Sequence, residues 1–265
     1  MRLSFLAVFI VLAVAGCRSS ERTAAMPYAL SQSALDDHLG RLSVAAADSA
    51  EAARQVRYAA GRMRAGGLMP VFASSFLLSV GRSAHGGPDP ARAHVLGYVP
   101  GRDPSRSDTL VLVAAPIHDA GAAAVLESAR RLALEALDAQ VPARTVLFAL
   151  WAPGPAGDRG LAEYLARPTW GLDRVVHAVL ITSDTAAAAR DEALLAEQGI
   201  ASEVLAAPRR FADGAPRPRE VLRAETHAFA EILHLRVRAR GLGENGPASL
   251  SSPRSPAYDA PRLAH

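Results

Sequence analysis

Cysteine is almost absent from this sequence of 265 residues, since Cys17 is the only one. The chain can therefore form no internal disulfide. Lysine is missing altogether, and all 29 basic residues are arginine. Alongside the many alanines, glycines and prolines, this bias is typical of a GC-rich genome and does not indicate a particular chemistry.

Blocks of like charge are also lacking, and the net charge of +3 is modest and scattered. Together with the export signal described next, this argues against nucleic-acid binding. No Gly-x-Ser-x-Gly elbow supports a serine hydrolase, and the isolated Gly-Gly pairs form no phosphate loop. Half of the residues are apolar and only 5% are aromatic. A substantial core can be buried, and its helices should pack closely through small side chains.

The N-terminus has the features of an export signal. Arg2 precedes an apolar run from 3 to 14, which is shorter than the ~20 residues that a membrane-spanning helix needs. Val14-Ala15-Gly16-Cys17 then resembles the lipobox of bacterial lipoproteins. We expect a signal peptide over 1–16, lipid attachment at Cys17, and a tether over 17–32. The alternative is an ordinary signal peptide with an incidental cysteine.

The lipid anchor would make the membrane a partner of this protein and place it in the cell envelope. Arg18, rather than Asp, follows Cys17. By the common sorting rule this favours the outer membrane, with the protein facing the periplasm.

Alternating strands and helices predict an α/β fold, a three-layer sandwich with a largely parallel, truncated central sheet between helices. Buried strands are expected at 109–115, 145–151 and 175–182, and further strands at 72–80 and 94–99. Helices are expected at 33–44, 45–65, 120–139, 159–166 and 185–198. The last helix should bury one face made of Leu222, Thr226, Phe229, Leu233 and Val237. The domain would cover 33–240, and 241–265 would be a disordered tail.

Several motifs occur in an order that resembles the zinc exopeptidases of peptidase family twenty-eight, the bacterial aminopeptidase type. The motif His38-Leu39-Gly40-Arg41-Leu42 matches the opening helix, and His94 to Gly101 matches an Asn-Val-hydrophobic-Gly-x-x-Pro-Gly strand and turn. Gly121 to Arg130 and Arg144 to Ala149 match a later helix and strand. The resemblance covers somewhat more than half of the chain. It implies an enzyme fold in which two zinc ions activate water and a glutamate acts as general base.

The residues for that chemistry are mostly missing. Pro116 stands where the resemblance places the first zinc histidine, and Ile117 where it places the bridging aspartate. Trp151 and Ala152 replace the glutamate pair. Asp184 matches a ligand position, whereas the final histidine motif has no counterpart. The sequence therefore predicts no catalytic residue, no metal ligand and no cofactor.

A rebuilt metal site is the alternative, and its candidate ligands follow predicted strands at the edge where ligands of α/β domains collect: His118, Asp119, Asp158 and Asp184. Each of these aspartates also precedes a predicted helix, where its carboxylate would cap free backbone N–H groups. Capping is the favoured interpretation. His118 is expected to be a partly exposed histidine and not a metal ligand. His227 and His234 lie seven residues apart and are expected on the surface or in a groove.

The sequence thus predicts a non-catalytic lipoprotein whose peptidase-like domain is a binding or scaffold module for an unknown protein or peptide partner. The family includes catalytically silent relatives that are used for binding. The alternative is an active metal-dependent exopeptidase or hydrolase, in which zinc would be the cofactor.

Overall fold

A computed structural model describes residues 29–42, 48–80, 89–138, 141–152, 160–209, 211–212 and 215–242. The predicted signal peptide, Cys17, most of the tether, Asp158 and the sequence after 242 lie outside the described residues. The helices are α2 (Gln32–Leu42), α3 (Ser49–Ala65), α4 (Ala120–Leu137), α5 (Gly160–Ala166), α6 (Thr185–Glu197) and α7 (Arg219–Leu242), with 3-10 turns at Pro90–Arg92 and Leu172–Arg174.

The central sheet has the order β1-β3-β5-β4-β6-β7, and β2 pairs separately with β3. Its strands are β1 (Met69–Pro70), β2 (Leu77–Ser79), β3 (Ala93–Val99), β4 (Leu110–Pro116), β5 (Thr145–Trp151), β6 (Val175–Thr182) and β7 (Ser202–Ala206). A separate pair of two-residue strands, β8 (Phe211–Ala212) and β9 (Ala215–Pro216), follows.

Strand β4 runs parallel to both of its neighbours, β5 and β6, and β6 is parallel to β7. The prediction of three adjacent, parallel, buried strands is confirmed. Strand β3 runs antiparallel to the others, since it pairs in the antiparallel sense with β5 and with the short strands β1 and β2. The predicted α/β sandwich with a largely parallel sheet is therefore the observed fold.

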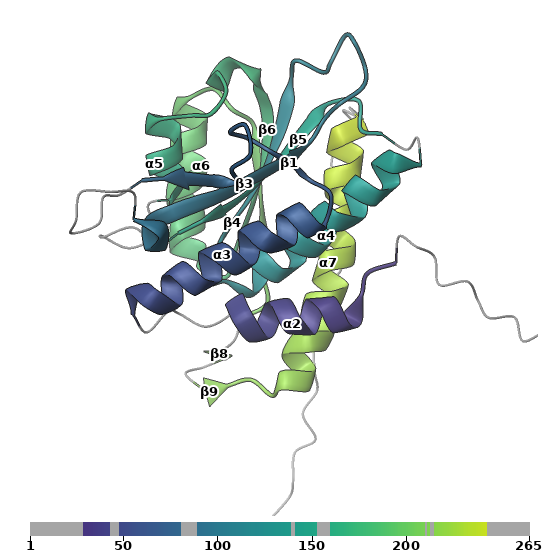
Figure 1. Cartoon of the computed structure of the whole chain (residues 1–265). Coiled ribbons are helices and arrows are strands. Elements are labelled where there is room, and N and C mark those ends of the chain that lie inside the picture. The colour runs from purple at the N-terminus through teal and green to yellow at the C-terminus, as the bar shows by residue number, and fades with distance from the viewer. Residues whose placement is uncertain are drawn as a thin grey trace, which may run out of the picture.

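Helices cover both faces of this sheet, with α2, α3, α4 and α7 on one side and α5 and α6 on the other (Figure 1). All seven residues of β4 are buried, as expected for a strand that is covered on both faces. Small side chains let the helices approach closely, and Ala122, Ala123 and Ala124 of α4 are completely buried. The predicted apolar face of the last helix is also confirmed.

Several elements differ from the sequence prediction, and the two-residue strands β1, β8 and β9 were not predicted. The expected strand over 72–80 is limited to Leu77–Ser79, because the chain turns at Ala73, which has a φ of +43°. Strand β7 was not predicted, since its sequence Ser-Glu-Val-Leu-Ala is short and half-buried. Helix α7 continues to Leu242, two residues into the segment expected to be disordered, because Gly241 packs on Pro142 and Val146.

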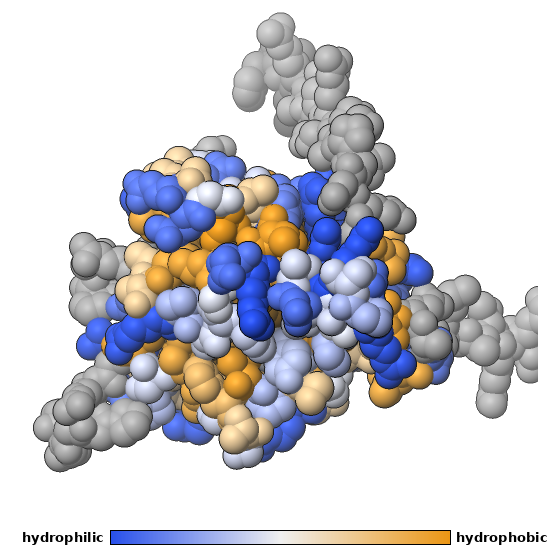
Figure 2. Space-filling model, turned by 90° about the horizontal axis from the view of Figure 1, so that it is seen from above, coloured by the Kyte–Doolittle hydropathy of each residue, from blue (hydrophilic) through white to orange (hydrophobic). Residues whose placement is uncertain are grey.

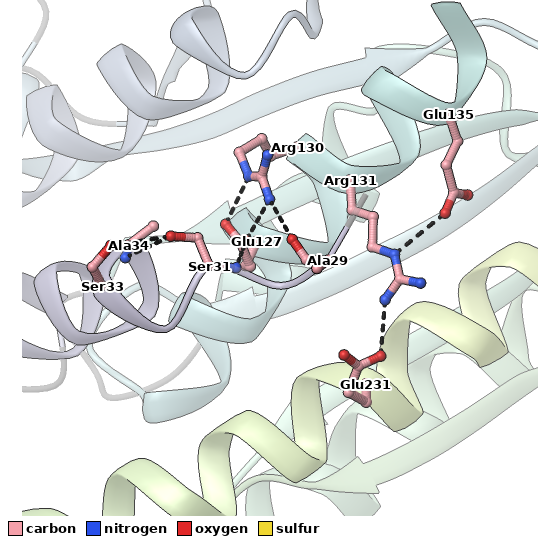
Figure 3. A network of polar contacts seen from close by, with 9 residues as sticks. All are labelled: Ala29, Ser31, Ser33, Ala34, Glu127, Arg130, Arg131, Glu135 and Glu231. Atoms are coloured by element: carbon pink, nitrogen blue, oxygen red, sulfur yellow. Dashed lines mark hydrogen bonds and ion pairs between the residues drawn. The ribbon is translucent and has the colours of Figure 1, made fainter. Parts of the chain in front are cut away.

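The domain also begins earlier than residue 33. The backbone N–H of Ser31 donates to the buried carboxylate of Glu127 at 2.7 Å. Arg130 donates both to Glu127 and to the carbonyl of Ala29 (Figure 3). This network fixes the start of the described chain to the outer side of α4.

Within the described part of the chain, no helix is both long and apolar enough to cross a membrane. Hydrophobic residues reach the surface in several places among hydrophilic ones (Figure 2). Singly exposed apolar residues are common on soluble proteins. The hydropathy of this face therefore does not by itself identify a binding site.

Candidate functional site

The carboxyl ends of the parallel strands meet at one edge of the sheet, which is where α/β domains usually bind ligands. Strand β4 ends here at Pro116, β5 at Trp151 and β6 at Thr182. The antiparallel strand β3 begins at the same edge, since Val95 pairs with Leu150. All the positions at which the resemblance expects zinc ligands or a general base, apart from the missing final histidine, therefore lie at these strand ends or directly after them.

Buried apolar residues occupy the middle of this edge. Ile117, Trp151 and Ala152 are each at most 2% exposed. The N–H of Ile117 donates to the carbonyl of Trp151 at 2.8 Å, so the two chain segments remain paired just past the strand ends. None of these three side chains can bind a metal or carry a proton.

The Trp151 ring lies on the α5 side of the sheet. It makes an edge contact with His94 at 5.1 Å between ring centroids and a tilted contact with Tyr164 at 5.3 Å. Gly160 allows this approach, because a Cβ atom there would be 2.2 Å from the Trp151 Cβ. Ile117 belongs to the core on the opposite face. The side chains of Trp151 and Ile117 therefore lie on opposite faces of the sheet.

Asp119 begins α4 as its N-cap and is only 7% exposed. One carboxylate oxygen accepts from the N–H of Gly121 at 2.9 Å. The other accepts from the N–H and the hydroxyl of Ser183, both at 2.7 Å. Capping is confirmed for this residue, and the same carboxylate joins the ends of β4 and β6.

Asp184 is the N-cap of α6, and its side chain accepts from the N–H groups of Ala186 and Ala187. It is exposed, which also fits a cap better than a buried metal ligand. The next residue back, Ser183, donates to Asp119, so both aspartates have a structural role. Asp158 lies outside the described residues.

His118 is half-buried, as predicted, and its Nδ1 is buried with no hydrogen-bond partner among the described residues. His118 thus has a buried ligand atom without a hydrogen-bond partner in the described part of the chain. In the portion of the chain that the structure describes, no three His, Cys, Asp or Glu side chains come together as a metal site. A pair of zinc ions needs several anionic or imidazole ligands to offset desolvation, so these residues do not fit it.

Sequence reasoning missed a buried histidine at this edge. His94 is completely buried, and its Nδ1 accepts from the N–H of Ala152 at 3.3 Å. Its Nε2 lies 3.7 Å from a carboxylate oxygen of Glu163 on α5. Burial, and then the charge of Arg167, lowers the pKa of His94 to about 4. The ring is therefore neutral at neutral pH, with its proton on Nε2. One feature of the sequence could have pointed to this residue: His94 occupies the first position of the strand-and-turn motif, which is usually Asn in the family that the sequence resembles.

The opening motif has a structural role as well. His38 is buried, and its Nδ1 lies 2.7 Å from the hydroxyl of Tyr58, which donates to Asp37. Burial lowers the pKa of His38 to about 4. The neutral imidazole therefore donates to Tyr58, and this chain of hydrogen bonds joins α2 to α3.

His234 corrects another expectation, because it is completely buried rather than at the surface. Its Nε2 lies 3.0 Å from Glu135 of α4, and burial lowers its pKa. Its position on the α4-facing side of α7 explains the burial. His227 is half-buried and lies seven residues, about two helical turns, before His234 on the same helix.

Comparison with known proteins gives only structural matches. No family model and no curated protein matches the sequence. The structure is similar to LapA of Legionella pneumophila, with a TM-score of 0.51 and 11% identity, over 80% of this chain and 73% of that one. A glutaminyl cyclase of Porphyromonas gingivalis matches at a TM-score of 0.49 and 11% identity, over 82% of this chain and 99% of that one.

An aminopeptidase of Aneurinibacillus sp. strain AM-1 matches at a TM-score of 0.41 and 15% identity, over 56% of this chain and 47% of that one. This chain thus spans about half the length of that aminopeptidase. LapA is itself described as an aminopeptidase. The predicted resemblance to zinc exopeptidases is therefore confirmed at the level of the fold. Sequence identity this low does not show that the activity is shared.

Proposed function

We propose that this chain is a cell-envelope lipoprotein whose zinc-peptidase-like domain has lost catalysis and serves as a binding or scaffold module. One observation carries the loss of catalysis. The carboxylates of Asp119 and Asp184, which remain at the carboxyl edge of the sheet, are both used as helix caps. Asp119 also accepts two hydrogen bonds from Ser183.

The chemistry of a zinc peptidase makes these losses severe. Its metal ions polarise the scissile carbonyl and lower the pKa of bound water, while a carboxylate accepts the proton of that water. Pro116 and Trp151 offer neither a ligand atom nor a base. Using Asp119 as a ligand would remove hydrogen bonds from the N–H groups of Gly121 and Ser183, which would cost folding free energy.

An active metal-dependent exopeptidase or hydrolase with a rebuilt site is the alternative. The unpartnered Nδ1 of His118 is the observation that favours it. In this alternative, the metal would be held by His118, Asp119, Asp158 and Asp184.

Zinc addition to the purified full-length protein separates the two functions. We expect the same melting temperature with chelator and with zinc, no stoichiometric zinc in the purified protein, and no hydrolysis of aminoacyl substrates. If the protein did bind zinc, a hundredfold excess of zinc over its dissociation constant would stabilise the folded state by about 2.7 kcal/mol. A thermal melt detects such a change easily. A shift that disappears in Asp184→Ala, together with turnover, would establish the alternative.

The lipoprotein part of the proposal needs its own test, because Cys17 lies outside the described residues. The wild-type protein should incorporate labelled fatty acid and sediment with the membrane fraction, and Cys17→Ala should abolish the labelling. Cys17→Ser is a matched control, since it keeps a polar side chain of similar size. Equal labelling of wild type and both variants would contradict lipid attachment at Cys17.

A further inference from the structure

Helix α7 is apolar on two opposite sides. Its inner side packs on the sheet and on α4 through residues such as Phe229, Leu233 and Val237. Its outer side has a second set of apolar residues at helical spacing, which we call the outer stripe: Val221, Ala224, Ala228, Ile232, Leu235, Ala239 and Leu242. Leu235 is 59% exposed, and Val221, Ile232 and Leu242 are each 39–44% exposed. Folding of the domain alone does not explain the outer stripe.

Positive charge flanks the C-terminal half of the outer stripe. Arg236 and Arg240 lie on one side of it and Arg238 on the other, as the helical spacing requires. Arg236 and Arg240 share one carboxylate, that of Glu203 on β7. Apolar side chains between arginines are typical of helices that lie in the surface of an anionic bilayer.

The N-terminal segment emerges beside this helix. Arg130 of α4 binds the carbonyl of Ala29, and the next residue, Arg131, pairs with Glu231 of α7 at 2.8 Å. Figure 3 shows two sets of contacts made by these consecutive residues of α4: Arg130 reaches the start of the described chain, and Arg131 reaches α7. Ala29 follows Cys17 by 12 positions, so a lipid on Cys17 would lie within about 40 Å of this point. The anchored bilayer would therefore be within reach of α7.

We propose that the outer stripe of α7 lies against the anionic phospholipid surface to which Cys17 is anchored. This inference rests on the lipoprotein part of the proposed function. The lipid chain alone would give only a tether around which the domain turns freely. Apolar contact and arginine–phosphate attraction along α7 would add the second attachment that stable and oriented membrane binding needs. The face of the sheet covered by α5 and α6 would then point away from the membrane.

A second copy of this chain is a less suitable occupant of the stripe. Stable protein interfaces use about 20–30 residues on each side, whereas the stripe is one residue wide along a single helix. Its C-terminal half is also bordered by arginines on both sides, so paired parallel copies would bring like charges together.

Lipid quenching of a fluorophore tests this orientation in the full lipidated chain. Lipid attachment consumes the thiol of Cys17, so a cysteine introduced at Leu235 is the only reactive thiol. A matched control is Ala193→Cys on α6, which is exposed on the opposite side of the sheet. Each variant is labelled with an environment-sensitive dye and placed in vesicles of phosphatidylethanolamine and phosphatidylglycerol that contain spin-labelled phospholipid.

We expect spin-labelled lipid to quench the dye at position 235 at least about twofold more than the dye at 193. Ile232→Cys should behave like Leu235→Cys, and unchanged melting temperatures would show that the variants fold. Equal quenching at 193 and 235 in an acylated, vesicle-bound protein would overturn the inference and leave the lipoprotein proposal standing. In another outcome, the emission of the dye at 235 would shift to the blue as the protein density on the vesicles rises, without quenching by lipid. That result would assign the outer stripe to contact with a second copy and would also overturn the inference. If mass spectrometry finds no acyl chain on the mature protein, the lipoprotein proposal and this inference both fail.

Discussion

Asp119 and Ser183 are joined by two hydrogen bonds, since one oxygen of the carboxylate accepts from both the N–H and the hydroxyl of Ser183 at 2.7 Å. The residues are far apart in sequence, and they connect the end of β4 to the end of β6. In a parallel sheet these ends meet at the edge where a ligand would bind. Asp119, which is a candidate ligand only in the alternative metal site, holds two strand–helix connections together.

Replacing Asp119 by alanine should therefore destabilise the protein more than replacing Asp184. Asp119→Ala removes a helix cap and leaves the N–H of Ser183 without its partner, so we expect a loss of about 2–4 kcal/mol. Asp184→Ala removes only an exposed cap and should cost about 1 kcal/mol. Urea denaturation of both variants measures the difference. Equal losses would mean that the bonds to Ser183 contribute little.

Acid should destabilise the protein through His94. Its pKa is near 6.5 in the unfolded chain and about 4 in the folded protein. Below pH 6.5 the unfolded state therefore binds a proton that the folded state excludes. The stability gained by burying the neutral ring is complete above pH 6.5, and about 3 kcal/mol of it is lost as the pH falls to 4.

His94→Asn is the matched variant for this prediction, because its amide oxygen can still accept from the N–H of Ala152 but does not titrate. Denaturation curves from pH 7 to pH 4 should show a smaller loss of stability for His94→Asn than for wild type. Parallel curves would mean that other groups, such as the buried His38, cause the acid sensitivity.

The sequence predicted the central strands and helices because their patterns are strong. The apolar runs that became β4 and β5 can be satisfied only by burial on both faces, and the spacing from Leu222 to Val237 fits one side of a helix. Asp119 and Asp184 were recognised as caps because each directly precedes a helix. These are local signals, which a single sequence contains in full.

Long-range contacts explain what could not be predicted. Strand β7 is short and half-buried, and it forms because the edge of β6 offers backbone partners. His234 is polar and resembles a surface residue until Glu135 of α4 is placed against it. In both cases the deciding partner lies on another element.

Glu127 should matter more for stability than its exposed counterpart Glu231, although both pair with arginines of α4 (Figure 3). Glu127 is completely buried and also accepts from Ser31. Glu127→Ala would leave the Ser31 N–H without its partner and Arg130 without its buried carboxylate, at a cost of about 2–4 kcal/mol. The carboxylate of Glu231 is 43% exposed, so Glu231→Ala should cost less than about 1 kcal/mol.

Limited proteolysis adds a local measurement to this comparison. Without Glu127 the chain around Ala29 is attached to α4 less firmly, since the bond from Ser31 is lost, so it should be cut faster in Glu127→Ala than in wild type. Glu231→Ala should be cut at the wild-type rate. Slow cutting of both variants would show that Arg130 alone holds the segment.

Two helical glycines should respond to alanine in opposite directions, because only one of them has space for a methyl group. At Gly121, near the start of α4, a Cβ atom would lie 2.3 Å from the Ile181 side chain and 3.2 Å from the Ala207 Cβ. Gly121→Ala must therefore push β6 and α4 apart, and we expect a loss of about 1–3 kcal/mol. At Gly61 of α3 nothing lies within 4 Å, so alanine should stabilise the helix by up to about 1 kcal/mol. Thermal melts of the two variants measure both effects. A stable Gly121→Ala protein would mean that the ends of β4 and β6 are held less closely than the Asp119–Ser183 bonds require.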